Sequence, residues 1–149
     1  MEEKVNSKPH TPPGVRLCNP LNIKKSSSQW QGMIPNNKGS FCQFKSFYYG
    51  WRAAIIIMAR TYYNRGWNTP KLIIEHWAPY TENNTRVYLA FVCKYAELDQ
   101  NKIMPPIQNN KMLWRRMLLA MAKIEIGYRF VTEEVVKELD QALNVVNYW

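Results

Sequence analysis

The sequence predicts a mainly α domain with a small irregular or β-containing part at its N-terminal end. From Ser46 onward, apolar residues recur at helical spacing, whereas Gly, Pro, Asn and Ser turn signals gather in residues 15–45. A length of 149 residues, with 46% hydrophobic and 21% charged side chains, is typical of one soluble globular domain with a sizeable core. We therefore predict a single α+β domain of about five helices over residues 15–149.

Two short segments precede the helices. Residues 1–14 are polar and Pro-rich, and we predict that they form a flexible tail. The piece FCQF, residues 41–44, carries strand-forming side chains between turn signals and predicts a small hairpin.

The first helix is predicted from about Phe47 to Asn64 and is strongly apolar. Its stripe at steps of three and four residues consists of Phe47, Trp51, Ile55, Met58 and Tyr62. A helix this apolar belongs in the centre of the core, and the sequence Asn64-Arg65-Gly66 ends it.

The next two helices have clear start signals. Thr69 as N-cap and Pro70 at the first helical position predict a short helix that ends before Pro79. A third helix is predicted over about residues 84–98, with Tyr88 among its buried side chains.

Two more helices complete the chain. The fourth is predicted from about Asn110 to Glu125, and Gly127 closes it. The fifth begins with Thr132 as its cap and buries a stripe that includes Leu139.

The formal net charge of +9 favours an anionic partner, such as nucleic acid, a membrane surface or an acidic wall polymer. The cations are scattered, and their short clusters at Lys24-Lys25 and Arg115-Arg116 do not resemble a basic arm. The net charge is the only feature of the sequence that favours nucleic-acid binding, so we do not favour that function.

The sequence carries no metal or cofactor motif. The two histidines are isolated, and Cys18, Cys42 and Cys93 lack the spacing of a zinc site or a disulfide framework, so we predict reduced thiols. Gly-rich phosphate loops and nucleophile elbows are also missing. No apolar run approaches the roughly 18 residues of a membrane span, and the N-terminus lacks a signal-peptide pattern. Carboxylates remain as the candidate chemical groups.

Glu125 is the sharper candidate. Leu118 and Met121 precede it by seven and four residues, so on a helix Glu125 lies on the apolar stripe. An acid there is desolvated, which raises its pKa and suits the general acid of a glycosidase. The alternative is that Glu125 leans outward from the last helical turn and pairs with Lys123, Arg129 or another cation.

Glu82 has two interpretations of its own. It lies just before the third helix, where a carboxylate favours the positive end of the helix dipole. Alternatively, Glu82 belongs to a sugar-binding cleft in which aromatic rings stack on pyranose rings and amides bind hydroxyl groups. The candidate cleft residues near it in sequence are Trp77, Tyr80, Asn83 and Asn84.

Three stretches resemble a family of small phage and prophage proteins. They are NPLNIKKSSSQWQG (19–32), GSFCQFKSFYYGWRA (39–53) and NTPKLIIEHWAPYTENNTRVYLAFV (68–92). Family members tend to read N-P-G-N-I-R, W-x-G, F-x-x-F, G-x-R-A and W-A-P-P-x-E-N-x-T, and to close with Glu-x-Gly, as Glu125-Ile126-Gly127 does. The resemblance covers roughly residues 18–143, and its most specific part is the WAP…ENNT segment.

The resemblance implies a lysozyme-like fold and a phage structural or virion protein related to peptidoglycan-cleaving enzymes. It lends weight to Glu125 as the general acid, and the family's Glu in W-A-P-P-x-E-N matches Glu82, as a second carboxylate or a substrate-positioning group. We also predict a substrate-binding role for Asn22. Several positions depart from the pattern, which leaves the activity of this member open. Leu21 replaces Gly, Tyr80 replaces the second Pro, and Ile124 and Ile126 stand where His and a polar residue are expected.

The leading hypothesis is a phage- or prophage-derived, lysozyme-like protein that binds and cleaves peptidoglycan without a cofactor. Its expected partners are peptidoglycan or another anionic wall polymer, and other virion proteins. We expect synthesis in the bacterial cytoplasm without a signal peptide, followed by virion association or delivery to the periplasm. The alternative is a non-catalytic virion or wall-binding protein in which Asn19, Asn22, Glu82 and Asn84 are structural polar groups.

Overall fold

A computed structural model describes residues 11–149. Most of the predicted tail, residues 1–10, lies outside the described residues. The rest of that segment leads into a short helix, α1 (Pro13–Arg16), in which Gly14 is buried.

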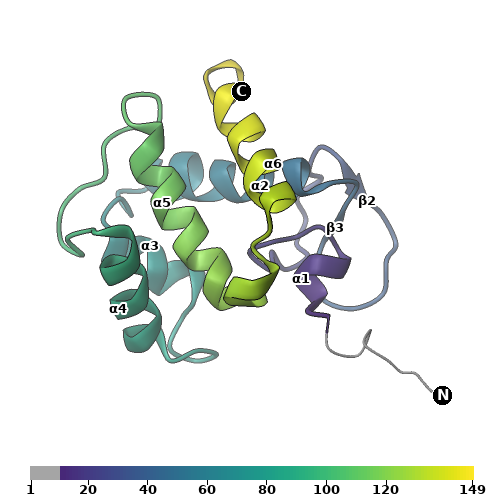
Figure 1. Cartoon of the computed structure of the whole chain (residues 1–149), viewed down its shortest axis with the longest axis horizontal. Coiled ribbons are helices and arrows are strands. Elements are labelled where there is room, and N and C mark those ends of the chain that lie inside the picture. The colour runs from purple at the N-terminus through teal and green to yellow at the C-terminus, as the bar shows by residue number, and fades with distance from the viewer. Residues whose placement is uncertain (1–10) are drawn as a thin grey trace.

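The chain is mainly α with one small antiparallel sheet, which confirms the predicted fold class (Figure 1). After α1 come the strands β2 (Met33–Ile34) and β3 (Gln43–Phe44), which pair with Met33 opposite Phe44. The helices that follow are α2 (Phe47–Ile56), α3 (Pro70–Trp77), α4 (Thr85–Ala96), α5 (Lys111–Ala122) and α6 (Glu133–Asn144). Short 3₁₀ turns, η4 (Tyr128–Phe130) and η5 (Val146–Tyr148), flank α6.

Side-chain caps fix where four helices begin. The caps are Thr69, Asn84, Asn110 and Thr132, and each side chain accepts a hydrogen bond from the backbone N–H three residues later. These starts agree with the predicted ones, because a cap needs only local sequence.

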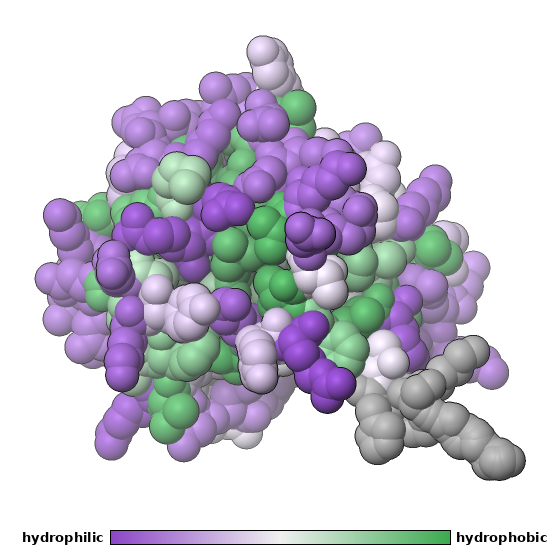
Figure 2. Space-filling model, in the orientation of Figure 1, coloured by the Kyte–Doolittle hydropathy of each residue, from purple (hydrophilic) through white to green (hydrophobic). Residues whose placement is uncertain are grey.

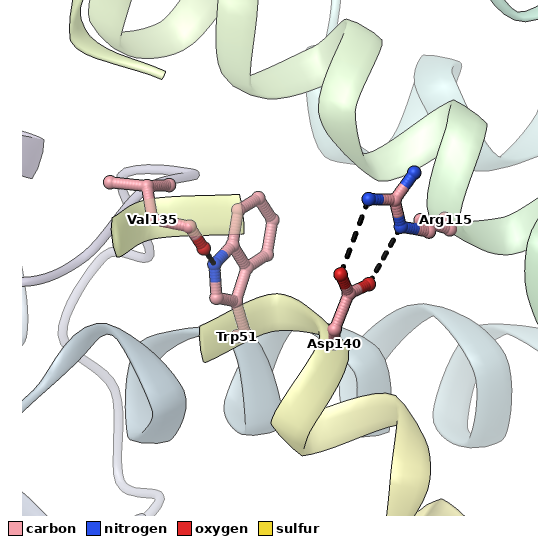
Figure 3. Close-up of polar contacts among 4 residues, drawn as sticks. All are labelled: Trp51, Arg115, Val135 and Asp140. Carbon is pink, nitrogen blue, oxygen red and sulfur yellow. Dashed lines mark hydrogen bonds and ion pairs between the residues drawn. The ribbon is translucent and has the colours of Figure 1, made fainter. Parts of the chain in front are cut away.

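Helix α2, whose Trp51 and Ala54 are fully buried, packs against α6, and α5 packs against both α4 and α6. The indole Nε1 of Trp51 donates to the carbonyl oxygen of Val135 at 3.0 Å, joining α2 to α6 (Figure 3). On the same helix, Asp140 accepts two hydrogen bonds from Arg115 of α5, at 2.6 and 3.2 Å. The three helices are thereby linked by polar contacts as well as by apolar burial.

A buried asparagine organises the N-terminal part. Asn19 Oδ1 accepts from the backbone N–H of Ile23, and its Nδ2 donates to the carbonyl oxygens of Ile23 and Cys42. Because these bonds satisfy backbone groups on two separate segments, Asn19 holds the Leu21–Lys24 loop against the strand region. The predicted structural role of Asn19 therefore agrees with its contacts.

Two predicted helices end in widened turns. The first continues from α2 into a π-helix, η2 (Ile57–Tyr62), and α5 continues into a second π-helix, η3 (Lys123–Gly127). Each π turn holds one residue more than an α turn, and such turns are frequent at functional sites. The sequence predicted unbroken helices here, because an apolar stripe does not reveal one inserted residue.

Polar residues cover much of the face shown in Figure 2, with apolar residues visible between them. Within residues 11–149, no helix is both long enough and apolar enough to cross a membrane. The three cysteines are free, and burial raises the pKa of each thiol.

Candidate functional site

A cleft of about 520 Å³ lies where the N-terminal loop, η2, the end of α3 and η3 meet. Each segment supplies side chains from a different part of the sequence. The lining includes Asn22, Lys24, Trp30, Ile57, Tyr62, His76, Trp77, Glu82, Asn83 and Glu125. The cleft therefore exists only when the N-terminal part is folded against the helices.

The carboxyl group of Glu125 is at the centre of a hydrogen-bond cluster in this cleft. Asn22 Nδ2 donates to Glu125 Oε1 at 3.0 Å and to the Glu125 carbonyl oxygen at 3.2 Å. The phenol of Tyr88 donates to Glu125 Oε2 at 2.8 Å. Both carboxyl oxygens are thus held by side chains that come from distant parts of the chain.

Burial raises the pKa of Glu125 above its ordinary value, against the opposing effect of the hydrogen bonds from Asn22 and Tyr88. The net upward direction means that desolvation outweighs these donors. The predicted desolvation is therefore present, and Glu125 turns inward instead of pairing with Lys123 or Arg129.

Backbone conformation helps to aim the Asn22 amide. Asn22 has φ +55°, in the left-handed region that Asn tolerates better than most residues. A Cβ on Gly14 of α1 would lie 2.9 Å from Asn22 Oδ1 and 2.6 Å from the Ile126 side chain. The small residue at position 14 lets α1 pack closely over η3 behind the Asn22–Glu125 contact.

Tyr88 was missed as a functional candidate, because its place on the apolar stripe of α4 predicted a core residue. It is buried, and burial together with the neighbouring Glu125 raises the pKa of its phenol well above 10. Its hydroxyl group could have indicated a polar contact in the core, since a buried Tyr normally needs a hydrogen-bond partner. A phenol that stays protonated remains a donor to Glu125 across the physiological range.

Glu82 lies on the cleft lining but does not join the Glu125 cluster. Its carboxylate forms an ion pair with Lys24, across the 58 residues that separate them in sequence. Both side chains are more than half exposed, so this ion pair joins two segments of the cleft lining at the protein surface. The N-cap of α4 is Asn84 and not Glu82.

The structure gathers most of the predicted cleft residues and leaves two outside. Trp77 and Asn83 line the cleft together with Glu82, Asn22 and Glu125. Tyr80 is 61% exposed and does not line it, and the side chain of Asn84 is used to cap α4. The substrate-binding role of these residues stays a prediction.

Sequence reasoning also overlooked an aromatic group beside the cleft. Tyr62 packs edge-on against Trp67 and Trp77, with ring centroids 5.2 and 6.4 Å away. Tyr62 and His76 line the cleft, as does Trp30, whose buried indole Nε1 has no hydrogen-bond partner among the described residues. No group of three or more His, Cys, Asp or Glu side chains that could hold a metal ion occurs in residues 11–149.

Comparison with known proteins identifies a phage relative. Over 129 residues the chain is 30% identical to Protein P5 of Pseudoalteromonas phage PM2, and the alignment covers 84% of this chain and 78% of that protein. No family model matches the chain.

Proposed function

We propose that this chain, which belongs to the family of Protein P5 of Pseudoalteromonas phage PM2, is a lysozyme-like protein that binds and cleaves the glycan strands of peptidoglycan. The observation that carries the proposal is Glu125, a desolvated carboxyl group with a raised pKa on the wall of an open cleft. Virion association, delivery to the cell wall and attraction of the +9 charge to an anionic wall belong to the same proposal.

In this proposal Glu125 is the general acid. Its raised pKa favours the protonated form, and the carboxyl group transfers its proton to the glycosidic oxygen as the bond to the anomeric carbon breaks. Asn22 and Tyr88 hold both oxygens, so the carboxyl group has little freedom to rotate. Trp77 and Asn83 supply an aromatic ring and an amide for the sugar residues.

Glu82 acts as a substrate-positioning group. Its carboxylate is paired with Lys24 at solvent level, whereas a catalytic base or nucleophile needs a free oxygen beside the reacting sugar. One acid is sufficient for a transglycosylase, in which a hydroxyl group of the substrate replaces water at the anomeric carbon and gives its proton to the Glu125 carboxylate. Fragments with anhydro ends identify that reaction, and reducing ends identify hydrolysis.

A non-catalytic wall-binding or virion protein is the second candidate, and a specific feature favours it. Ile124 and Ile126 flank Glu125, so neither sequence neighbour offers a polar side chain to assist proton transfer. In that case the Asn22–Glu125–Tyr88 contacts serve only to join the N-terminal loop to α4 and η3.

The test is release of soluble fragments from purified Gram-negative peptidoglycan, followed by mass spectrometry. Wild type is compared with Glu125→Gln and Glu82→Gln, and circular dichroism checks that each variant is folded. We expect Glu125→Gln to lose at least about 100-fold in activity, the scale of general acid catalysis, and Glu82→Gln to lose less than about 10-fold.

The outcomes separate the candidates. Equal losses in the two variants would make Glu82 a second catalytic carboxylate. A folded wild type that releases nothing from several wall types, yet sediments with them, would replace the enzyme with the wall-binding protein.

A further inference from the structure

Beside the cleft, a stacked pair of aromatic rings lies next to an arginine. The imidazole of His76 lies parallel to the indole of Trp67, with ring centroids 3.5 Å apart and an interplanar angle of 9°. The guanidinium carbon of Arg65 lies 5.2 Å from the centroid of the Trp67 ring. We call this group the Arg65–Trp67–His76 stack.

The backbone holds the stack in place. A tight turn after η2 is closed by hydrogen bonds from the N–H groups of Arg65 and Trp67 to the carbonyl oxygen of Tyr62, at 2.9 and 3.0 Å. Gly66 occupies this turn at φ +84°. His76 is fixed from α3, because its Nδ1 lies 2.8 Å from the carbonyl oxygen of Leu72. The N–H of Nδ1 is thus used within the helix, which leaves Nε2 available.

The stack is continuous with the cleft. His76 and Tyr62 both line the cleft, and the Tyr62 ring packs edge-on against Trp67. The charge of Arg65 acts at Tyr62, where it lowers a phenol pKa that burial raises. An anionic group that extends from a strand in the cleft would therefore meet the field of Arg65.

The stack is suited to an anion and not to another sugar ring. An indole binds a pyranose through its open face, but the Trp67 ring is already packed against His76 and Arg65. Arg65 and His76 are exposed, and within residues 11–149 no carboxylate forms an ion pair with Arg65. A guanidinium held over an indole loses less freedom when it binds a carboxylate through two N–H groups.

We propose that the Arg65–Trp67–His76 stack binds a carboxylate of the peptide stems carried by peptidoglycan strands, and so favours peptide-bearing strands over bare glycan. This inference rests on the proposed function, since it assumes a glycan strand in the cleft. The stack would be a second recognition element, which binds the peptide substituent and not the sugar.

The test measures binding of two soluble probes to the Glu125→Gln protein, which leaves the strands intact. The probes are sonicated glycan strands with their peptide stems, and the same strands after an amidase has removed the stems. We expect the peptide-bearing strands to bind roughly 3- to 10-fold more tightly, the contribution of one exposed or partly desolvated ion pair.

Variants then locate the effect. Arg65→Gln and Trp67→Leu should each reduce the affinity for peptide-bearing strands to that for stripped strands, and change the latter less than about 2-fold. Arg86→Gln is the matched control, because it removes an equal exposed charge from α4 at a residue that does not line the cleft. Equal losses from Arg65→Gln and Arg86→Gln would overturn the site in favour of the general field of the protein.

The remaining outcomes are also informative. Equal affinity for both probes would overturn the carboxylate site and leave the glycan cleft standing, whereas binding of neither probe would overturn both proposals. Competition by inorganic phosphate but not by acetate at equal ionic strength would assign the stack to a phosphate ligand and overturn the peptide carboxylate.

Discussion

The phenol of Tyr88 donates a hydrogen bond of 2.8 Å to Oε2 of Glu125, and the two residues are 37 positions apart. This contact opposes the desolvation of Glu125, because a donor stabilises the ionised carboxylate. The pKa of Glu125 is therefore set by a balance that single substitutions can move in either direction.

Tyr88→Phe should raise the pKa of Glu125 further, because it removes one of the donors that lower it. Carbon-13 NMR of the Glu125 carboxyl group measures this titration directly, and the basic limb of the pH–activity profile should move to higher pH in parallel. Tyr63→Phe is the matched control, since its phenol donates to the Met104 carbonyl oxygen at 2.7 Å. Each variant should lose about 1–2 kcal/mol of stability, because each loses one hydrogen bond. A shift of the Glu125 pKa in Tyr63→Phe as well would contradict a local effect of Tyr88.

Asn22→Asp should raise the pKa of Glu125 more than Tyr88→Phe does. The substitution keeps the size of the side chain and tolerates φ +55°, but it replaces a donor with a second acid beside Glu125. The two acids should then share a proton and titrate as a coupled pair, visible by NMR as two steps. Asn36→Asp is the control, because Asn36 also has a left-handed backbone, at φ +65°, and lies on an exposed turn. A rise in the Glu125 pKa in this variant would attribute the effect to the added charge in general. An unchanged titration in Asn22→Asp would show that the amide does not act on Glu125.

Glu125→Gln should stabilise the fold at pH 7 relative to wild type. The folded-state pKa of Glu125 is raised above 4.5, so the folded protein binds this proton more tightly than the unfolded chain. The associated stability is fully present below about pH 4.5 and is lost as the pH rises through the folded pKa. Thermal unfolding should therefore show a Tm advantage of Glu125→Gln at pH 7 that shrinks toward pH 4. A difference that is independent of pH would contradict this linkage.

Gly32→Ala should lower the free energy of unfolding more than Gly39→Ala does. Gly32 has φ +76°, and an added Cβ would lie 2.1 Å from Cγ of Tyr49, so strain and overlap both apply. We expect a loss of roughly 2–4 kcal/mol in chemical denaturation. Gly39 has φ +91° with open space around it, so its variant should lose only about 1 kcal/mol. Similar losses at the two positions would mean that the Tyr49 contact contributes little.

The helices could be predicted because their signals are local. Thr69, Asn84, Asn110 and Thr132 each cap a helix within three residues, and the apolar stripes repeat within each element. The predicted β-containing part was also confirmed, although the strands contain only two residues each. Such short strands depend on Asn19 and on neighbouring segments more than on their own propensity.

The site was only partly predictable because its contacts join distant segments. The spacing of Glu125 to Leu118 and Met121 indicated desolvation but left the outward alternative open, and its donors Asn22 and Tyr88 lie 103 and 37 residues away. The partner of Glu82 was equally remote, since nothing in the local sequence indicates Lys24. A local pattern can place a carboxyl group on an apolar face, but the groups that hold it there are set by tertiary structure.

The π turn at η3 contains Glu125. Because a π turn holds one residue more than an α turn, removing one residue here and closing the turn as an α turn would leave the later side chains near their present directions. Removing a residue from an ordinary α turn would instead rotate each later side chain by about 100° around the helix axis. A gap of one residue in this segment among relatives would accordingly mark loss of the widened turn, even where the acid itself is retained.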